Sequence, residues 1–156
     1  IPEKRFMRMA LRQAYRNCVD LRGGPFGAVI VKNGVILARA RNSVLVHDAT
    51  AHAEMNAIRL ASAKLKTFDL SGCAIYSTTE PCPMCFSAIH WARIDTVIFG
   101  TTTRDAKRTG FHELLIDDKT LKRLGKSRVR LIPGFMYQEC KKLFDDWKRI
   151  PERTYY

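Results

Sequence analysis

The spacing of apolar residues alternates along this chain between a helical period and short strand-like runs, and this alternation constrains the fold most. Apolar residues recur at helical intervals from Arg5 to Leu21. A Gly-Gly-Pro sequence at 23–25 ends that pattern. Phe26 to Val31 then has the composition of a strand, and Asn33-Gly34 predicts a tight hairpin into a second strand from Val35 to Ala40.

The rest of the chain alternates strands with helices. Helices are expected over 51–64, from Pro81 to about 92, at 112–116 and over 136–148, with strands over 73–77, 95–99 and 129–132 and a loop over 100–111. Strands that are linked through helices run parallel, with helices on both faces of the sheet. We therefore expect a three-layer α/β/α sandwich with a mixed sheet of about five strands, formed by residues 1–156 as a single domain.

Length and composition exclude several classes of protein. The 156 residues are 46% hydrophobic and 27% charged, which is typical of a globular domain with a sizeable core. No apolar run approaches the length of a membrane span, and residues 1–12 lack the apolar segment of a secretory signal. The odd number of cysteines, five, argues against a disulfide framework. The sequence predicts a cytoplasmic protein with no membrane partner.

The formal net charge of +12 suggests an anionic partner or substrate, although solubility alone would also explain it. The excess is spread along the chain. One run is purely basic, from Lys119 to Arg130, with six basic side chains and no acid. It contains no aromatic residue on which a base could stack. Transfer RNA or single-stranded nucleic acid is therefore a possible partner on charge alone.

Two short segments carry side chains that can bind a metal. One contains His52 and Glu54, and the other contains Cys82 and Cys85. Two cysteines three residues apart on a helix face the same way, with their Cβ atoms about 5–6 Å apart. At the start of a helix the unsatisfied N–H groups also lower thiol pKa values. The two thiolates suit one zinc ion, with His52 as the third ligand.

Three protein ligands leave one position on zinc open. A structural zinc site normally has four protein ligands, whereas a catalytic site keeps one position for water. Zinc brings the pKa of that water to about 7. Glu54 lies two residues after the histidine, so it is placed beside the metal rather than on it. Its carboxylate can move protons from the water to the substrate nitrogen and the leaving amine.

Each of these features has another interpretation when taken alone. A C-x-x-C pair can be a redox pair or half of a structural zinc site, and His52 can be a buried core residue. A fourth structural ligand could come from Cys73, His90 or Cys140. A nucleic-acid-binding module with structural zinc is therefore the alternative to an enzyme. Together, however, H-x-E followed by P-C-x-x-C is the known signature of zinc nucleobase deaminases.

With these motifs the chain resembles the cytidine deaminase superfamily over roughly residues 4–115, and within it most closely the bacterial guanine deaminases. The resemblance is carried by Gly23-Gly24-Pro25-Phe26-Gly27-Ala28-Val29, Arg41-Asn42, the His52 motif, Glu80 to Cys85, Ala88 to Arg93 and Tyr155-Tyr156. It implies a cytidine deaminase-like fold, one zinc ion per chain and hydrolytic deamination of a heterocyclic base or nucleoside. The first expectation is the conversion of guanine to xanthine and ammonia.

The resemblance also implies roles for residues around the metal. Phe26 and Trp91 would hold a planar base between them, and Asn42 and the backbone of Ala53 would form hydrogen bonds to its edge. Glu113 stands where these enzymes have a second proton-transferring acid, which is usually an aspartate. On their own the two aromatic residues could equally be core residues, Asn42 a turn residue and Glu113 a surface residue.

The resemblance further implies a homodimer in which residues 150–156 cross to the partner subunit. Tyr156 would then close the partner's pocket. Two consecutive tyrosines at 155 and 156 are costly to leave in water, which supports a docked tail. The alternative is a frayed tail without function.

Other features are similar to tRNA adenosine deaminases. They are Arg104 to Lys107 followed by Thr109-Gly110, then Pro133-Gly134 and Glu139-Cys140, together with the basic charge. Pro25-Phe26, and Pro83 between the cysteines, are instead similar to guanine deaminases. Conversion of adenosine to inosine in tRNA, and deamination of cytosine or a nucleoside, are therefore the alternative functions.

Overall fold

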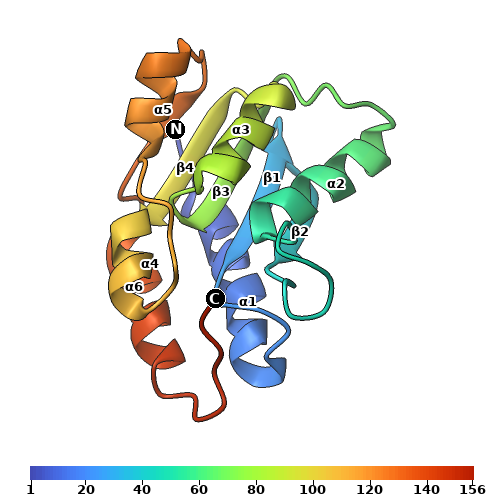
Figure 1. The fold of residues 1–156 in the computed structure, drawn as a ribbon. Helices are drawn as coiled ribbons and strands as arrows, with labels where there is room; N and C mark the ends of the chain where they lie inside the picture. Colours follow the sequence, from blue (N-terminus) through green and yellow to red (C-terminus); the bar gives the residue numbers. More distant parts are fainter.

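The computed structural model describes residues 1–156, which form helices and strands in the alternating order that the apolar pattern predicts (Figure 1). The helices are α1 (Lys4–Asp20), α2 (Ala53–Leu65), α3 (Pro83–Trp91), α4 (Thr103–Thr109), α5 (Asp118–Gly125) and α6 (Tyr137–Trp147). The strands are β1 (Gly27–Lys32), β2 (Val35–Arg41), β3 (Cys73–Thr79), β4 (Thr96–Thr101) and β5 (Arg130–Ile132).

The five strands form one mixed sheet in the order β2-β1-β3-β4-β5. Strand β1 is antiparallel to both β2 and β3, and β3, β4 and β5 run parallel to one another. The hairpin between β1 and β2 turns at Asn33 and Gly34, where φ is 49° and 75°. Positive φ at both central residues is the geometry that an Asn-Gly hairpin favours. The expected mixed sheet of five strands is confirmed.

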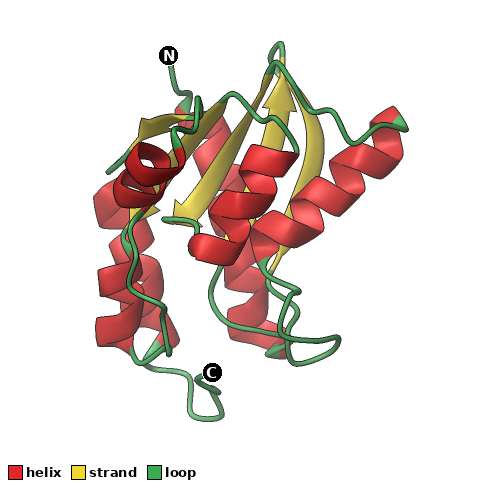
Figure 2. Cartoon of the chain, turned by 45° about the horizontal axis from the view of Figure 1, so that its top comes forward, coloured by secondary structure: helices red, strands yellow, loops and turns green.

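Helices cover both faces of the sheet (Figure 2). Helices α1 and α6 lie on one face, and α2 and α3 lie on the other. Side chains alternate between the two faces along a strand. In β1, Ala28 and Ile30 belong to the core under α2 and α3, whereas Val29 and Val31 belong to the core under α1. The three-layer sandwich is therefore the observed architecture, with one core on each side of the sheet.

The structure differs from the sequence-based expectation between residues 100 and 125. Thr103–Thr109 is a helix rather than a loop, because Thr102 and Asp105 form a reciprocal cap at its N-terminus. Residues 112–116 are irregular rather than helical. The next helix begins only after Asp117, whose side chain caps it. None of the helices has the length and apolar character needed to cross a membrane.

Asp118, the first residue of α5, is a buried carboxyl group without a hydrogen-bond donor. Its side chain is fully inaccessible to solvent, and neither carboxyl oxygen has a partner. Burial, and then the nearby carboxylate of Glu80, raise the pKa of Asp118 from 3.8 to about 9. The folded state therefore holds a proton there that the unfolded chain releases above pH 4. The free energy of unfolding therefore decreases as the pH rises from about 4 to about 9, because the unfolded chain gains stability by releasing this proton.

We expect Asp118→Asn to make stability less dependent on pH. Because the folded-state pKa is raised, the wild type should lose stability relative to this variant from about pH 4 to pH 9, by at most about 1.4 kcal/mol per pH unit. Urea unfolding of both chains between pH 5 and 8 measures the slope. Asp117→Asn is the matched control, because hydrogen bonds from Thr120 lower the pKa of Asp117. A stability difference for Asp118→Asn that stays constant across this range would contradict the assignment.

Candidate active site

The topology of the sheet brings the two metal-binding segments together. Strands β2 and β3 are both antiparallel to β1, so they run in the same direction. The helices that follow them, α2 and α3, pack on the same face and begin at the same edge of the sheet. His52 is the N-cap residue of α2, and Cys82 is the N-cap residue of α3. Residues that are thirty positions apart in the sequence thus meet in space.

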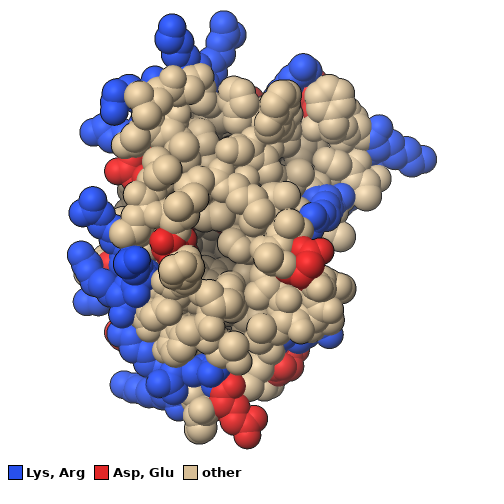
Figure 3. Space-filling model, viewed as in Figure 1, with Lys and Arg blue, Asp and Glu red and all other residues tan.

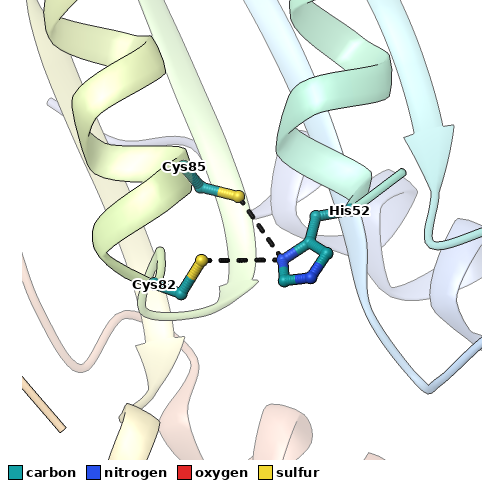
Figure 4. Close-up of side chains that lie close together, drawn as sticks. All are labelled: His52, Cys82 and Cys85. Carbon is teal, nitrogen blue, oxygen red and sulfur yellow. Dashed lines mark hydrogen bonds between the residues drawn. The ribbon is translucent and has the colours of Figure 1, made fainter. Parts of the chain in front are cut away.

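The three candidate ligands have the geometry of a zinc site (Figure 4). The Nδ1 atom of His52 lies 3.6 Å from the Sγ atom of Cys82 and 3.6 Å from that of Cys85. All three ligand atoms lie within 4.8 Å of one another. Zn–N bonds of about 2.0–2.1 Å and Zn–S bonds of about 2.3 Å at a tetrahedral angle separate N from S by roughly 3.6 Å. The residues present therefore fit one zinc ion.

The start of α3 determines how the two cysteines are presented. Pro83 occupies the first helical position, where its missing N–H costs nothing, so the helix begins two residues later than expected. Cys82 precedes it, and Cys85 lies fully buried in the first turn. A hydrogen bond from Cys85 lowers the pKa of Cys82 to about 4, whereas that bond and burial raise the pKa of Cys85.

Glu54 lies in the first turn of α2, directly beside the ligands. Its side chain is only 6% exposed, and burial raises its pKa above the usual value. The positive end of the helix dipole opposes this effect and favours the carboxylate. A raised pKa makes this carboxylate a better proton acceptor than an exposed glutamate, which suits a group that accepts a proton and then donates it.

A small cavity adjoins the ligands and Glu54. Its volume is about 100 Å³, and it is lined by Phe26, Asn42, His52, Glu54, Thr79, Glu80, Cys82, Phe111, His112, Glu113 and Tyr156. In the space-filling view a hollow opens near the middle of the face, where Figure 1 shows the starts of α2 and α3 and the C-terminus (Figure 3). Two larger hollows of about 1170 and 1240 Å³ lie elsewhere and contain no zinc ligand.

Three aromatic side chains surround this cavity. The ring centroid of Phe111 lies 5.0 Å from that of Phe26 and 5.2 Å from that of Tyr156, with edge-to-face geometry in both pairs. The expected partner Trp91 is not among them. It lies at the far end of α3, and its side chain is 78% exposed. Within one chain, Trp91 therefore does not line the cavity with Phe26, and the ring beside Phe26 is that of Phe111.

Of the two expected polar contacts, Asn42 lines the cavity, and the N–H of Ala53 lies at the start of α2. The Oδ1 atom of Asn42 accepts a hydrogen bond of 3.1 Å from the N–H of Val44, which fixes the orientation of the buried amide. Its Nδ2 group forms no hydrogen bond within the chain and is left as a donor beside the cavity. Ala53 is the first residue of α2, so its N–H has no acceptor within the helix. Both groups are thus available to a ligand.

Glu113 also lines the cavity, as the sequence predicts. It lies in the irregular segment that precedes α5, and its side chain is half-buried. Burial raises its pKa to about 7, with a further contribution from the Cys82 thiolate. The cavity therefore has two carboxyl groups, Glu54 and Glu113, whose pKa values are both raised.

Residues 150–156 return to the cavity of their own chain. The main-chain oxygen of Tyr156 accepts a hydrogen bond of 2.7 Å from His112, and its hydroxyl accepts one of 3.1 Å from the N–H of Gly24. A Cβ atom on Gly24 would lie 2.6 Å from that hydroxyl oxygen, and one on Gly110 would lie 2.8 Å from the ring of Tyr155. Glycine is required at both positions for this approach. Within one chain the tail thus reaches the cavity, and its exchange with a partner subunit stays a prediction.

The sequence pattern of the cytidine and deoxycytidylate deaminase zinc-binding region matches residues 2–101. The match includes all three candidate zinc ligands and Glu54. The chain belongs to this deaminase family. It is accordingly a zinc-dependent hydrolase, and the alternative of a binding module with structural zinc is excluded.

Individual relatives of this deaminase fall into two groups. This chain is 40% identical to a guanine deaminase of Bacillus subtilis over 138 residues, and the aligned part covers 86% of each of the two chains. It is 44% identical over 119 residues to a tRNA-specific adenosine deaminase of Aquifex aeolicus, covering 74% of this chain and 77% of that protein. The solved structure of a guanine deaminase from Nitrosomonas europaea superimposes with a TM-score of 0.85 at 26% identity, covering 94% of this chain and 85% of the other.

Four residues that line the cavity are not among the site residues predicted from the sequence, namely Thr79, Glu80, Phe111 and His112. Phe111 falls at the end of the loop expected over 100–111, and Glu80 at the start of the cysteine motif. The glycine before Phe111 was the available signal, because Gly110 has a φ of 133° and marks a sharp turn of the chain. Glu80 gave a signal as a charged residue directly after a buried strand.

Proposed function

We propose that this deaminase converts guanine and water to xanthine and ammonia. The observation that carries the proposal is the small cavity that joins the zinc ligands, Glu54 and a set of aromatic side chains. Its volume of about 100 Å³ is small beside the roughly 300–1,000 Å³ of typical ligand pockets. Such a cavity favours a single planar ring system over a nucleoside. The identity to a guanine deaminase supports this choice of base.

Glu54 is proposed to carry the protons of the reaction. When bound, zinc supplies Lewis-acid activation of a water molecule at neutral pH. The Glu54 carboxylate takes a proton from this water as the oxygen bonds to the carbon that bears the amino group. It gives this first proton to the neighbouring ring nitrogen. It then takes the second proton from the new hydroxyl group and gives it to the amino group, so that ammonia leaves and the oxygen stays on the carbon as a carbonyl. Burial of Glu54 keeps bulk water from exchanging this proton.

The other cavity residues are proposed to bind and orient the base. Phe26 offers one aromatic surface, and Phe111 packs against Phe26 in edge-to-face geometry. Asn42 and the N–H of Ala53 donate hydrogen bonds to acceptors on the edge of the ring. Glu113 assists proton transfer to the leaving group, from the opposite segment of the chain. The positions of Phe26, Asn42, Phe111 and Glu113 around one cavity support these roles.

Deamination of adenosine in tRNA is the second candidate function. The relative from Aquifex aeolicus supports it, and so does a groove of about 1170 Å³ beside α5. The groove is lined by the basic residues Arg104, Lys119, Lys122, Arg123, Lys126 and Arg130, and none of them forms an ion pair. Basic side chains gather on this side of the molecule (Figure 3). A phosphate backbone is the kind of partner that such a groove attracts.

A comparison of substrates tests the two candidates. Ammonia release by the zinc-loaded chain is measured with guanine, guanosine, adenine, cytosine and adenosine-containing tRNA. The proposal expects the highest kcat/KM with guanine. A higher kcat/KM for the formation of inosine in tRNA would favour the second candidate and reject the first.

The assembly is proposed to be a homodimer in the cytoplasm. Large apolar side chains are exposed around α2 and α3, among them Phe68 (64% exposed) and Trp91 (78% exposed). Exposed apolar surface of this kind is typical of a subunit interface. All five cysteines are unpaired, as in a reducing compartment. Sedimentation of wild type and Trp91→Glu tests the interface, with the variant expected to be monomeric.

Deletion of Thr154 to Tyr156 should impair binding of the base without loss of zinc. Tyr156 lines the cavity and is held there by the hydrogen bond from Gly24, and a lid that keeps water out strengthens the polar contacts inside a site. We expect kcat/KM for guanine to fall by about tenfold or more. Steady-state kinetics and elemental analysis for zinc give the two measurements.

A mixing experiment shows which chain supplies the tail. Tail-deleted chains are mixed with Glu54→Ala chains under conditions in which subunits exchange. Closure within one chain, as in the structure, predicts no recovery of activity. Recovery would show that the tail closes the partner's cavity, whereas unchanged kcat/KM in the deleted chain alone would reject the tail as a lid.

A further inference from the structure

Glu80 is a buried carboxylate that the proposed chemistry does not use. It lies between the end of β3 and the Pro81-Cys82 pair, and its side chain is 7% exposed. Its own N–H donates a hydrogen bond of 2.7 Å to the carbonyl of Thr101 at the end of β4. This hydrogen bond holds the backbone of Glu80 against β4 in the middle of the sheet. Only Pro81 separates Glu80 from the zinc ligand Cys82.

The Glu80 side chain accepts three hydrogen bonds from two separate places in the chain. Its Oε1 atom accepts one from the N–H of Thr103 at 3.1 Å and one from the Thr103 hydroxyl at 3.2 Å. Its Oε2 atom accepts one from the N–H of Asp118 at 3.0 Å. Both oxygens are engaged, so Glu80 is a poor candidate for moving protons although it borders the cavity. Hydrogen bonds to an ionised acceptor are about twice as strong as neutral ones.

The two places that Glu80 holds are the two ends of one segment. Thr103 is the first residue of α4, and Asp118 is the first residue of α5. The irregular stretch 111–117 lies between them and brings Phe111 and Glu113 to the cavity. Few other hydrogen bonds tie this stretch to the rest of the molecule, and the main one joins His112 to the tail.

We propose that Glu80 is a positioning residue that clamps both ends of segment 103–118 and thereby holds Glu113 and Phe111 at the cavity. The clamp couples the loop with the second carboxyl group to the strand that leads into Cys82. The effect of the clamp on catalysis rests on the proposed function of Glu113. Its effect on the mobility of residues 111–117 does not. A shift of about 1 Å in a catalytic group can cost roughly 100-fold in rate, so such a clamp matters for catalysis.

Glu80→Gln is the variant that tests the clamp. Glutamine has nearly the same shape, but one of its two terminal atoms is a nitrogen that donates and cannot accept. Whichever way the amide turns, one end of segment 103–118 loses its acceptor and meets a second donor. Hydrogen exchange of the zinc-loaded chain, measured by mass spectrometry, should show faster exchange in peptides covering 111–117. Peptides from α1 and β1 should be unchanged.

Ile98→Val is the control for a general loss of stability. It removes one methylene group from the core under α1 and α6, away from the loop. It should lower the Tm without selectively speeding exchange at 111–117. Unchanged exchange at 111–117 in Glu80→Gln, or faster exchange of equal size throughout the chain, would overturn the clamp whatever the substrate proves to be.

Kinetics of Glu80→Gln, measured in the wild-type chain and in a Glu113→Gln chain, then separate a positioning role of Glu80 from a general effect on the structure. In the otherwise wild-type enzyme, Glu80→Gln should keep its zinc and lower kcat for guanine by roughly 10- to 100-fold. In a Glu113→Gln background the same change should lower kcat much less, because Glu113, one of the two groups that it positions, is already disabled and only the effect through Phe111 remains. An equal loss of kcat in both backgrounds would show that Glu80 does not act through Glu113. Full activity of Glu113→Gln would reject the proposed role of Glu113, while the exchange measurement still decides the clamp.

Discussion

Glu54→Gln should keep its zinc and its fold but lose deamination by about 100- to 10,000-fold, the range that general acid–base catalysis typically supplies. Glutamine preserves the shape of the buried side chain, yet it can neither accept a proton from water nor pass one to the leaving amine. Because burial already raises the pKa of Glu54, a neutral side chain at this position should not destabilise the chain. Ammonia release and zinc content are measured on the same sample.

The exposed Glu139 of α6 provides the matched control. Glu139→Gln makes the same change of charge far from the cavity and should leave kcat unchanged. Activity of Glu54→Gln within tenfold of wild type would rule out its proton-carrying role. Loss of zinc from that variant would instead make Glu54 part of the metal site.

Cys85→Ala should lose zinc, activity and part of its thermal stability together. Cys85 is fully buried in the first turn of α3, so no other side chain can take its place as a ligand. Metal binding contributes to the free energy of unfolding, because the ligands are brought together only in the folded chain. We expect zinc content to fall from about one ion per chain to near zero, with kcat reduced at least 100-fold.

Cys73→Ala separates metal binding from simple packing. Cys73 is equally buried but lies at the opposite end of β3 from the metal site. Its replacement also removes a thiol from the core, so Tm should fall, but zinc and most of the activity should remain. Full zinc occupancy in Cys85→Ala, by elemental analysis, would contradict the ligand assignment.

Local patterns were enough to predict most of the fold. The Asn33-Gly34 turn requires positive φ at both residues, which few other sequences allow, so the hairpin could be placed from two letters. The strands and the long helices bury one or both of their faces. Apolar residues therefore recur along the sequence with the period of a strand or of a helix. Helices α4 and α5 are short and polar, and their ends depend on caps at Thr102 and Asp117. Periodicity carries little information about such helices.

The metal site was predictable because its residues are read from chemistry and spacing. Two cysteines at the start of one helix and a histidine at the start of another have few other reasons to occur together. The aromatic surroundings were harder, since Phe26 meets Phe111 only through contacts between segments 85 residues apart. The exposure of Trp91 and the path of the tail depend on packing of the whole chain. Neither the exposure of Trp91 nor the path of the tail can be predicted from the spacing of apolar residues.

The most direct measurement is of the products that the zinc-loaded chain forms from guanine in water enriched in oxygen-18. Hydrolytic deamination predicts one molecule of ammonia for each molecule of xanthine, with a single oxygen-18 atom at the carbon that carried the amino group. Removal of zinc by a chelator should abolish both products, and restoring zinc should return them. Xanthine without the label, or formation of product at an unchanged rate after zinc is removed, would contradict a zinc-dependent hydrolysis of guanine at this site.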